Sequence, residues 1–466
     1  MRRIAGVVVL SLLAAPRLAS AQNFAQTPPT PAVQPAGQAP SPMPPGQSAE
    51  QPPQKAPASP GAPAPIVDLT GRVLTLPDVI KIALETQPLI LSRLYDYAAA
   101  RFRVDEAIAP LLPQLSAIWT ASRDRLASFS ARPATVTQNN ARLALSQILF
   151  DFGKTVAATE VSKRLADVAK ENLDLQRDLI VLAVKQAYFN LLFGQRLVKV
   201  NEEALKRADL NLRSARGFYD VGTRPKSAVV RAEVDVANAK LTLIQAHNAE
   251  QLARVALNTS MGIPVETPTQ ILDILGEHQP YQIDHAQLLA EALRHRPEYK
   301  QAKLQVDAAE ATVRLQFRNF FPDITGNAFV SRTTTDFREI WELGVALNWS
   351  IFDGGNKIAR YREALASLQS AQAQVRSEEL TIAQDVEQAY LNVGATDEQI
   401  QAVRAAVASG EENFRLAKGR FDAGLGTVLD LTDAQLALTQ AQSTEAQALT
   451  NFRIAVATLE RALGRR

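Results

Sequence analysis

The chain has 466 residues, and its 50 Lys and Arg nearly balance its 48 Asp and Glu, so the net charge is only +2 at pH 7. This balance gives no electrostatic footprint for binding nucleic acid. The sequence contains no cysteine, which excludes disulfides, thiol nucleophiles, cysteine metal sites and lipidation through a cysteine. Any attachment to a membrane must therefore come from the fold itself.

The N-terminus has the pattern of an export signal. Arg2 and Arg3 precede an apolar run from Ile4 to Ala15, and Ala19-Ser20-Ala21 forms a small-x-small cleavage site. We expect residues 1–21 to be a signal peptide. The alternative is an uncleaved anchor, but the run is shorter than the roughly 20 apolar residues that span a bilayer comfortably.

A proline-rich segment follows at residues 22–70. Of the 26 prolines in the chain, 14 lie between positions 27 and 65, mixed with Ala, Gln, Ser and Gly. Such a composition cannot bury a hydrophobic core. We interpret the segment as a disordered linker, which is either a semi-rigid tether or a leader without a specific partner.

The rest of the chain is a tandem repeat. Phe150-Asp151-Phe152-Gly153 recurs as Phe352-Asp353-Gly354-Gly355, and the offset of 202 residues is kept as far as Gly262 and Gly464. An offset that never slips is expected of long helices packed in register. We place the first repeat at residues 71–265, a linker at 266–283 and the second repeat at 284–466.

Each repeat opens with a helix that a proline interrupts. These helices are expected from Leu76 to about Ala109, with a break at Pro88, and from Asp284 to Asn319, with a break at Pro297. Pairs of strands follow at residues 113–150 and 322–352. The first copy has seven more residues in this region, and we expect them in a hairpin loop.

The segment from Trp341 to Ile351 is the clearest strand, because large apolar residues alternate with small or polar ones. Its expected partner is 323–332, and 115–120 and 142–150 take the equivalent places in the first copy. A soluble sandwich would give the same alternation. The export signal, the strand length and the tryptophans near both ends favour a membrane strand. The residues expected to face lipid are Trp341, Leu343, Val345, Leu347 and Trp349.

Four strands per chain cannot close a barrel, and open strand edges are not viable in lipid. Three chains would supply 12 strands, an even number within the range of membrane barrels. After each pair of strands, a proline-free helix is expected at 153–217 and at 355–419, each about 95 Å long. Heptad positions from Ile358 to Val393 are mostly apolar, which indicates coiled-coil packing. Glycine-bearing turns near 217–225 and 419–427 would reverse the chain at the two tips.

Together, the tandem repeat, the Phe-Asp-x-Gly entry to each long helix, the Ala-Tyr-x-Asn segments and the glycine tips make this chain resemble TolC-like outer membrane efflux proteins. The resemblance covers essentially all of residues 74–464. It implies a mainly α fold with membrane β: a homotrimer with a 12-stranded barrel in the outer membrane, continued by a periplasmic helical coiled-coil barrel. It also implies an exit duct of an efflux or type I secretion system, joined by a periplasmic adaptor to an inner-membrane pump.

The resemblance assigns roles to the tips. Adaptor docking is implied for Val221, Gly222, Thr223, Gly424, Gly426 and Thr427. Asp430 and Asp433 would form an acidic ring at the periplasmic entrance, where like charges can raise carboxyl pKa values; the alternative is a pair of solvated helix-surface carboxylates.

The entrance departs from the family pattern. Some members hold it closed through arginine, tyrosine and aspartate, but the matching positions here hold Gly426, Phe421 and Ala228. Arg224 is the available substitute, so Arg224 and Phe421 are the candidate gate residues. We hypothesise that helix packing holds this entrance closed, in which case Arg224→Ala leaves the conductance unchanged.

An enzyme is not expected. The four histidines show no spacing of three or four residues, so a helical metal site has no support, and no cofactor is expected. Asp151-Phe152-Gly153 resembles a kinase triplet, but no glycine-rich phosphate loop precedes it. The competing interpretation is an exported structural coiled-coil protein without channel activity.

Overall fold

The computed structural model describes residues 72–128, 131–276, 285–333 and 339–466. The expected signal peptide and proline-rich linker lie outside these residues. The first repeat consists of β1 Val73–Leu74, α1 Leu76–Thr86, α2 Pro88–Ile108, a short 3-10 turn Ala109–Leu111, β2 Gln114–Ser128, β3 Ala131–Phe150, α3 Lys154–Asp220 and α4 Lys226–Met261. The expected linker contains β4 Gln270–Ile271, which pairs with β1. The second repeat consists of α5 His285–His295, α6 Pro297–Arg318, β5 Asp323–Thr333, β6 Glu339–Asn348, α7 Asn356–Asp422 and α8 Val428–Ala462.

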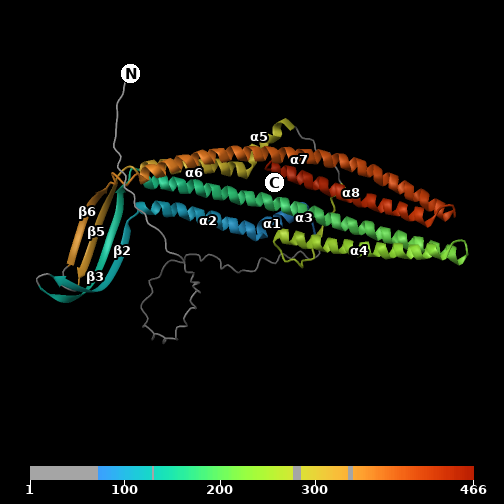
Figure 1. Cartoon of the computed structure of the whole chain (residues 1–466), viewed down its shortest axis with the longest axis horizontal. Coiled ribbons are helices and arrows are strands. Elements are labelled where there is room, and N and C mark those ends of the chain that lie inside the picture. Colours follow the sequence, from blue (N-terminus) through green and yellow to red (C-terminus); the bar gives the residue numbers. More distant parts are fainter. Residues whose placement is uncertain (1–71, 129–130, 277–284, 334–338) are drawn as a thin grey trace, which may run out of the picture. The chain divides into compact units, whose positions relative to one another are not determined.

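The two longest helices are related by the same offset as the sequence motifs. Helices α3 and α7 have 67 residues each, and both of their ends are related by the offset of 202. At 1.5 Å per residue each is about 100 Å long. Figure 1 shows that α3 with α4, and α7 with α8, form two helical hairpins whose turns lie at the end away from the strands. Within the described residues, none of the helices is both long enough and apolar enough to cross a membrane.

The recurring aspartate begins each long helix. The Asp151 carboxylate accepts hydrogen bonds from the backbone N–H groups of Gly153 (2.9 Å) and Thr155 (2.7 Å), and Asp353 accepts one from Lys357 (3.1 Å). These N–H groups have no partner within the helix, so a side-chain acceptor stabilises the helix start. The Phe-Asp-x-Gly motif is therefore a strand-to-helix cap.

The strands form one antiparallel sheet in the order β2-β3-β5-β6. The pairing joins the two repeats through β3 and β5, with Leu143 opposite Val330. The expectation of a longer hairpin loop in the first copy was wrong. β2 and β3 have 15 and 20 residues, whereas β5 and β6 have 11 and 10, so the first hairpin is longer in its paired strands.

The recurring glycines near the ends of the repeats allow close packing at the helix breaks. Gly262 and Gly464 both have φ of 74°, a conformation that other residues adopt only with strain. A Cβ on Gly262 would lie 2.8 Å from the Cα of Gln87, and one on Gly464 would lie 2.9 Å from the carbonyl carbon of His295. Each glycine thus packs closely against the backbone at a point where one helix ends and the next begins.

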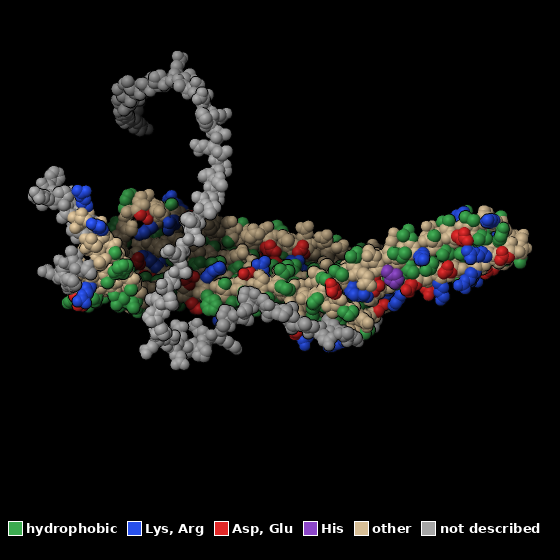
Figure 2. Space-filling view, turned by 90° about the horizontal axis from the view of Figure 1, so that it is seen from below, with side chains coloured by type: hydrophobic (Ala, Val, Ile, Leu, Met, Phe, Trp, Pro, Cys, Tyr) green, Lys and Arg blue, Asp and Glu red, His purple; other side chains and the backbone are tan. Residues whose placement is uncertain are grey.

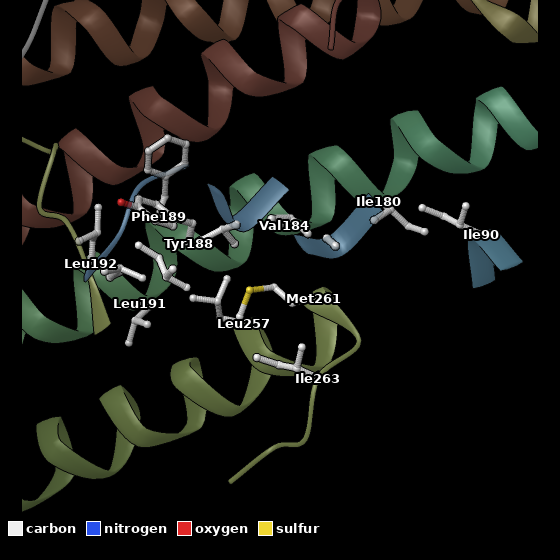
Figure 3. Close-up of a cluster of buried hydrophobic side chains, with 14 of the residues drawn as sticks. Ile90, Ile180, Val184, Tyr188, Phe189, Leu191, Leu192, Leu257, Met261 and Ile263 are labelled. Carbon is white, nitrogen blue, oxygen red and sulfur yellow. The ribbon is translucent and has the colours of Figure 1, made fainter. Parts of the chain in front are cut away.

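Two hydrophobic clusters hold the helices of each repeat together. In the first, Leu191, Leu192 and Leu257 are fully buried, and Leu191 and Leu257 lie between α3 and α4 (Figure 3). Tyr188 lies in the same cluster, and its hydroxyl donates a hydrogen bond to the carbonyl of Leu272 (2.6 Å). Burial raises the pKa of Tyr188 to about 12, so this hydroxyl stays a donor at physiological pH. The second cluster packs α5 against α7 and α8.

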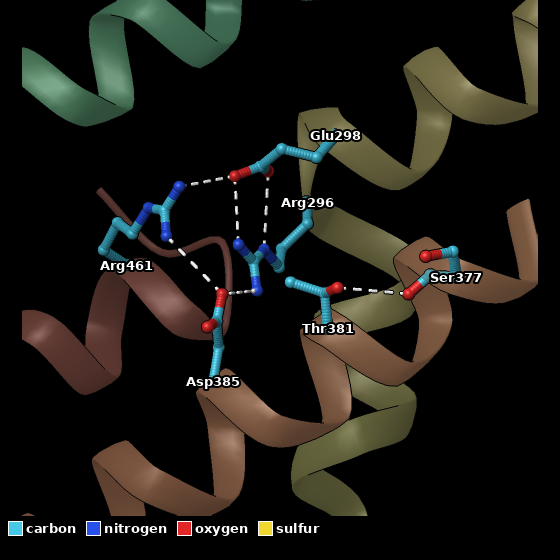
Figure 4. A network of polar contacts seen from close by, with 6 residues as sticks. All are labelled: Arg296, Glu298, Ser377, Thr381, Asp385 and Arg461. Atoms are coloured by element: carbon cyan, nitrogen blue, oxygen red, sulfur yellow. Dashed lines mark hydrogen bonds and ion pairs between the residues drawn. The ribbon is translucent and has the colours of Figure 1, made fainter. Parts of the chain in front are cut away.

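The break between α5 and α6 carries a buried ionic network (Figure 4). Arg296 is 2% exposed and contacts the carboxylates of Glu298 (3.0 Å) and Asp385 (2.9 Å), and Arg461 also donates to Glu298. The equivalent break in the first repeat is neutral, because Gln87 donates to the carbonyls of Thr259 and Ser260. The same backbone junction is therefore stabilised by charge in only one of the repeats.

Candidate functional site

The sheet has one apolar face. The strand register places the following residues on it: Leu115, Ala117, Trp119 and Ala121 of β2, Ala141, Leu143 and Leu145 of β3, Ile324, Gly326, Ala328 and Val330 of β5, and Trp341, Leu343, Val345 and Leu347 of β6. Gln147 is a polar exception. Trp341, Leu343 and Val345 are 73%, 79% and 69% exposed in the single chain. An exposed apolar surface of this extent marks a contact with lipid or protein.

The two ends of this face differ from its middle. Towards the hairpin turns, Arg332 lies opposite Glu339, so the apolar rows end in a charged pair. At the other end, Trp349 was expected within the strand, but β6 ends at Asn348. The Trp349 indole N–H donates to the carbonyl of Phe320 (3.1 Å), which joins the chain leaving the strand to the end of α6. From Trp341 to Trp349 the chain covers about 26 Å at ~3.3 Å per residue.

The opposite face of the sheet is polar. Ser331 donates a hydrogen bond to the side-chain carbonyl of Asn140 (2.6 Å), and Ser146 donates to that of Asn327 (2.9 Å), which links β3 to β5. The Arg142 guanidinium lies 3.9 Å from the centre of the Phe329 ring. An apolar face backed by a hydrogen-bonded polar face is the pattern of a strand between lipid and water.

Each helical hairpin turns through a glycine in the left-handed conformation. Gly222 has φ of 73° and Gly424 has φ of 75°. In the first turn, the backbone N–H and the hydroxyl of Thr223 both donate to the carbonyl of Phe218. In the second turn, the Gly426 N–H donates to the carbonyl of Arg420 (2.9 Å). These bonds fix the loops, and the exposed Val221 extends from the first of them.

The structure brings the two candidate gate residues together. Arg224, in the first tip, donates hydrogen bonds to the carbonyls of Gly426 (2.8 Å) and Phe421 (3.4 Å) in the second tip. Its guanidinium lies 4.3 Å from the centre of the Phe421 ring, which is 1% exposed and also contacts Phe218. Arg224 thus contacts two of the positions at which family members were expected to carry a polar lock.

Asp430 and Thr427 form a helix cap. The Asp430 carboxylate accepts hydrogen bonds from the hydroxyl (2.7 Å) and the backbone N–H (3.1 Å) of Thr427, and the Thr427 hydroxyl accepts one from the Asp430 N–H. These hydrogen bonds from Thr427 lower the pKa of Asp430 in the single chain. Asp433 is exposed one turn further along α8. The raised carboxyl pKa expected for an acidic ring of Asp430 and Asp433 requires the carboxylates of several chains. In the single chain, the pKa of Asp430 is lowered instead.

Sequence reasoning missed the polar contacts that join the two helical hairpins above the tips. Thr432 donates to Asp235 (2.9 Å), and Asn211 donates to Gln435 (2.7 Å). The only available signal was that Asn211 itself recurs at position 413, which identifies a repeat position but no partner. In the described part of the chain, no group of three or more His, Cys, Asp and Glu side chains is arranged to hold a metal ion.

Comparison with known proteins agrees with this geometry. The sequence profile of the outer membrane efflux protein family matches residues 79–263 and 288–465. Nodulation protein T of Rhizobium leguminosarum bv. trifolii is 25% identical over 382 residues, covering 79% of this chain and 80% of that protein. Outer membrane protein TolC of Escherichia coli K12 is 25% identical over 402 residues, covering 79% and 78%.

The fold is also that of a solved structure. The crystal structure of outer membrane protein VceC from Vibrio cholerae superposes with a TM-score of 0.70 at 21% identity, covering 84% of this chain and 96% of that chain. The family profile covers both repeats and most of the chain. The chain therefore belongs to the outer membrane efflux protein family, and it is a TolC-like protein of the outer membrane.

Proposed function

We propose that this chain is one protomer of a trimeric channel, the passive outer-membrane exit duct of a tripartite efflux or type I secretion system. The observation that carries the proposal is the two-faced sheet with open edges. In the order β2-β3-β5-β6, the outer strands β2 and β6 each have a single neighbour. Unpaired strand edges are not tolerated in lipid, so β6 of one chain must pair with β2 of the next.

The strand count allows three copies, and the resemblance to TolC-like proteins selects that number. Four strands per chain give 12 in a trimer, within the range of membrane barrels. The apolar face then lies against lipid, with Trp341 and Trp349 near its two borders and Val345 midway between them. The polar face, with Arg142 and Asn327, lines the lumen. A lumen of hydrogen-bonded polar groups stays wet, which a duct for varied cargo requires.

The helices support the same closure. Helix α4 leaves a row of exposed apolar side chains at coiled-coil spacing: Val230, Val234, Leu241, Ile244, Leu252 and Val255. Helix α7 also leaves apolar side chains exposed: Ile358, Leu365, Leu380, Leu391 and Leu416. Neighbouring copies that close the barrel would cover both rows, and the helices would form a tunnel through the periplasm.

The tips supply the periplasmic end of the duct. Val221, Gly222, Thr223, Gly424, Gly426 and Thr427 form the surface that receives a periplasmic adaptor, which joins the channel to an inner-membrane transporter. Asp430 and Asp433 would contribute six carboxylates to the entrance of a trimer and favour cations there. Beside the helix packing hypothesised above, the bonds from Arg224 to the second tip offer another way to hold the entrance closed.

An exported coiled-coil protein without channel activity remains the alternative. It has no use for an apolar strand face as exposed as that of Trp341 and Leu343. The deciding experiment is the native mass of the protein extracted from isolated outer membranes in mild detergent, followed by single-channel recording in planar bilayers. A conducting trimer is expected, and a soluble monomer or dimer without conductance would refute the proposal.

A further inference from the structure

The two tips of one chain carry opposite net charge, although they are copies of one repeat. Residues 206–240, the first turn with fifteen residues on either side, contain eight Lys and Arg and four Asp and Glu, a net charge of +4. Residues 408–442, which are 202 positions further on, contain three Lys and Arg and five Asp and Glu, a net charge of −2. Matched windows therefore differ by six charges per chain.

The charges of the first tip are available to a partner. Arg213, Lys226 and Arg231 are exposed, and within the described residues none of them forms an ion pair with a carboxylate. Two other cations of this tip do form ion pairs, Arg216 with Glu233 (2.8 Å) and Lys206 with Glu203 (3.9 Å). Figure 2 shows Lys and Arg side chains, together with Asp and Glu, exposed along the narrow helical end of the molecule, away from the strands.

The opposite charges of the two tips do not neutralise each other. The contact between the tips runs from Arg224 to the backbone carbonyls of Gly426 and Phe421, not to carboxylates. On the second tip, Glu411 and Asp422 are exposed and have no ion pair among the described residues, whereas Glu412 pairs with Arg415. Both sets of charges therefore face outward.

We propose that the first tip docks an acidic helical surface of the periplasmic adaptor and that the second tip docks a basic one. This inference rests on the proposed docking role of the tips and adds the chemistry of the partner. The first tip also exposes Val221 and Val230, so the matching surface is an amphipathic helix with carboxylates beside apolar residues. In a trimer, positive and negative tips would alternate around the ring, and complementary charge would fix the register of docking.

The test uses the purified full-length protein and two fluorescent amphipathic helical peptides, one with Leu and Glu, the other with Lys in place of Glu. Binding is measured by fluorescence anisotropy at 50 and 300 mM salt. The variant Arg213→Glu/Lys226→Glu/Arg231→Glu reverses three charges. It should weaken binding of the acidic peptide at least tenfold at 50 mM salt. The effect should be smaller at 300 mM, because salt screens exposed charges.

The matched control is a second triple reversal, Lys81→Glu/Lys163→Glu/Lys170→Glu, on exposed lysines of α1 and the start of α3, far along the chain from the tip. It should bind the acidic peptide within twofold of the native protein. The reciprocal variant Glu411→Lys/Asp422→Lys should weaken binding of the Lys peptide and leave binding of the acidic peptide unchanged.

Equal effects of the two triple variants, or equal binding of both peptides by the first-tip variant, would overturn the inference. So would loss of binding to phosphatidylglycerol vesicles with unchanged binding of the acidic peptide, because the first tip would then be a membrane surface. Native mass and conductance are measured on the same preparations. A conducting trimer with unchanged peptide binding refutes the charge inference alone, whereas a non-conducting monomer refutes the proposed function.

Discussion

Lysine at Val345 places a charge halfway along the apolar face of β6, between Trp341 and Trp349. Val345 is 69% exposed in the single chain, so in the proposed barrel its side chain faces lipid. A lysine at the bilayer midplane of a membrane barrel costs about 2–4 kcal/mol. Three copies in one trimer would together cost about 6–12 kcal/mol, which is comparable to the whole stability of a typical domain.

The matched control moves the same charge by one residue. Ala346 precedes Leu347 and lies opposite Thr325 on the polar face, so Ala346→Lys should place its charge in the wet lumen at almost no cost. The assay is the fraction of each variant recovered as a heat-resistant trimer from the outer membrane, and the urea midpoint of refolding into lipid vesicles.

Val345→Lys should be depleted from the membrane fraction and refold at lower urea, whereas Ala346→Lys should resemble the native protein. If the two variants behave alike, or if Ala346→Lys is the more damaging one, the assignment of the lipid face is wrong. Because the positions are adjacent, differences in expression or signal-peptide processing cannot imitate the expected contrast.

Three further predictions concern the helices. Gly262→Ala should lower the free energy of unfolding by roughly 2–4 kcal/mol, because Ala is strained at positive φ and its Cβ meets the backbone of Gln87; Gly217→Ala, with open space around its Cβ, should stabilise in the same thermal melts. If the bond from Arg224 to Gly426 helps to close the entrance, Arg224→Ala should increase closed-state conductance in bilayers. A conductance equal to that of the native channel would instead support the hypothesis that helix packing holds the entrance closed. Burial by itself raises the pKa of Glu298, but the hydrogen bonds from Arg296 outweigh this effect, and the net result is a lowered pKa. The pair therefore stabilises the fold fully at pH values above the ordinary carboxyl pKa. This stabilisation is lost as the pH falls through the lowered pKa. Glu298→Gln should cost about 3 kcal/mol at pH 7 and flatten the acid end of the melting profile; an acid limb as steep as in the native protein would contradict the assignment.

The long helices could be predicted closely from the sequence. They were expected at 153–217 and 355–419, and the structure has them at 154–220 and 356–422. A fixed offset and the absence of proline constrain a helix over its whole length, because both are local properties of the chain. The helix breaks at Pro88 and Pro297 were found for the same reason.

Features that depend on distant partners could not be predicted. β3 extends to Ala131, well before the expected start at Arg142, because pairing with β2 supplies hydrogen bonds where the sequence has no clear alternation. The bond from Arg224 to Gly426 joins positions 202 residues apart, and only the packing of the two tips brings them together. Heptad positions such as Ile382 and Val386 are buried within the chain, whereas Ile358, from the same heptad pattern, is 50% exposed.

The two unpaired sheet edges also have a genetic consequence. If β6 of each chain must pair with β2 of the next, one chain with a defective edge strand prevents closure of every barrel into which it is incorporated. A cell that makes equal amounts of native and edge-defective chains would assemble roughly one in eight of its trimers from native chains alone. Such alleles would be dominant, and export would fall far more than the loss of half the native protein would suggest.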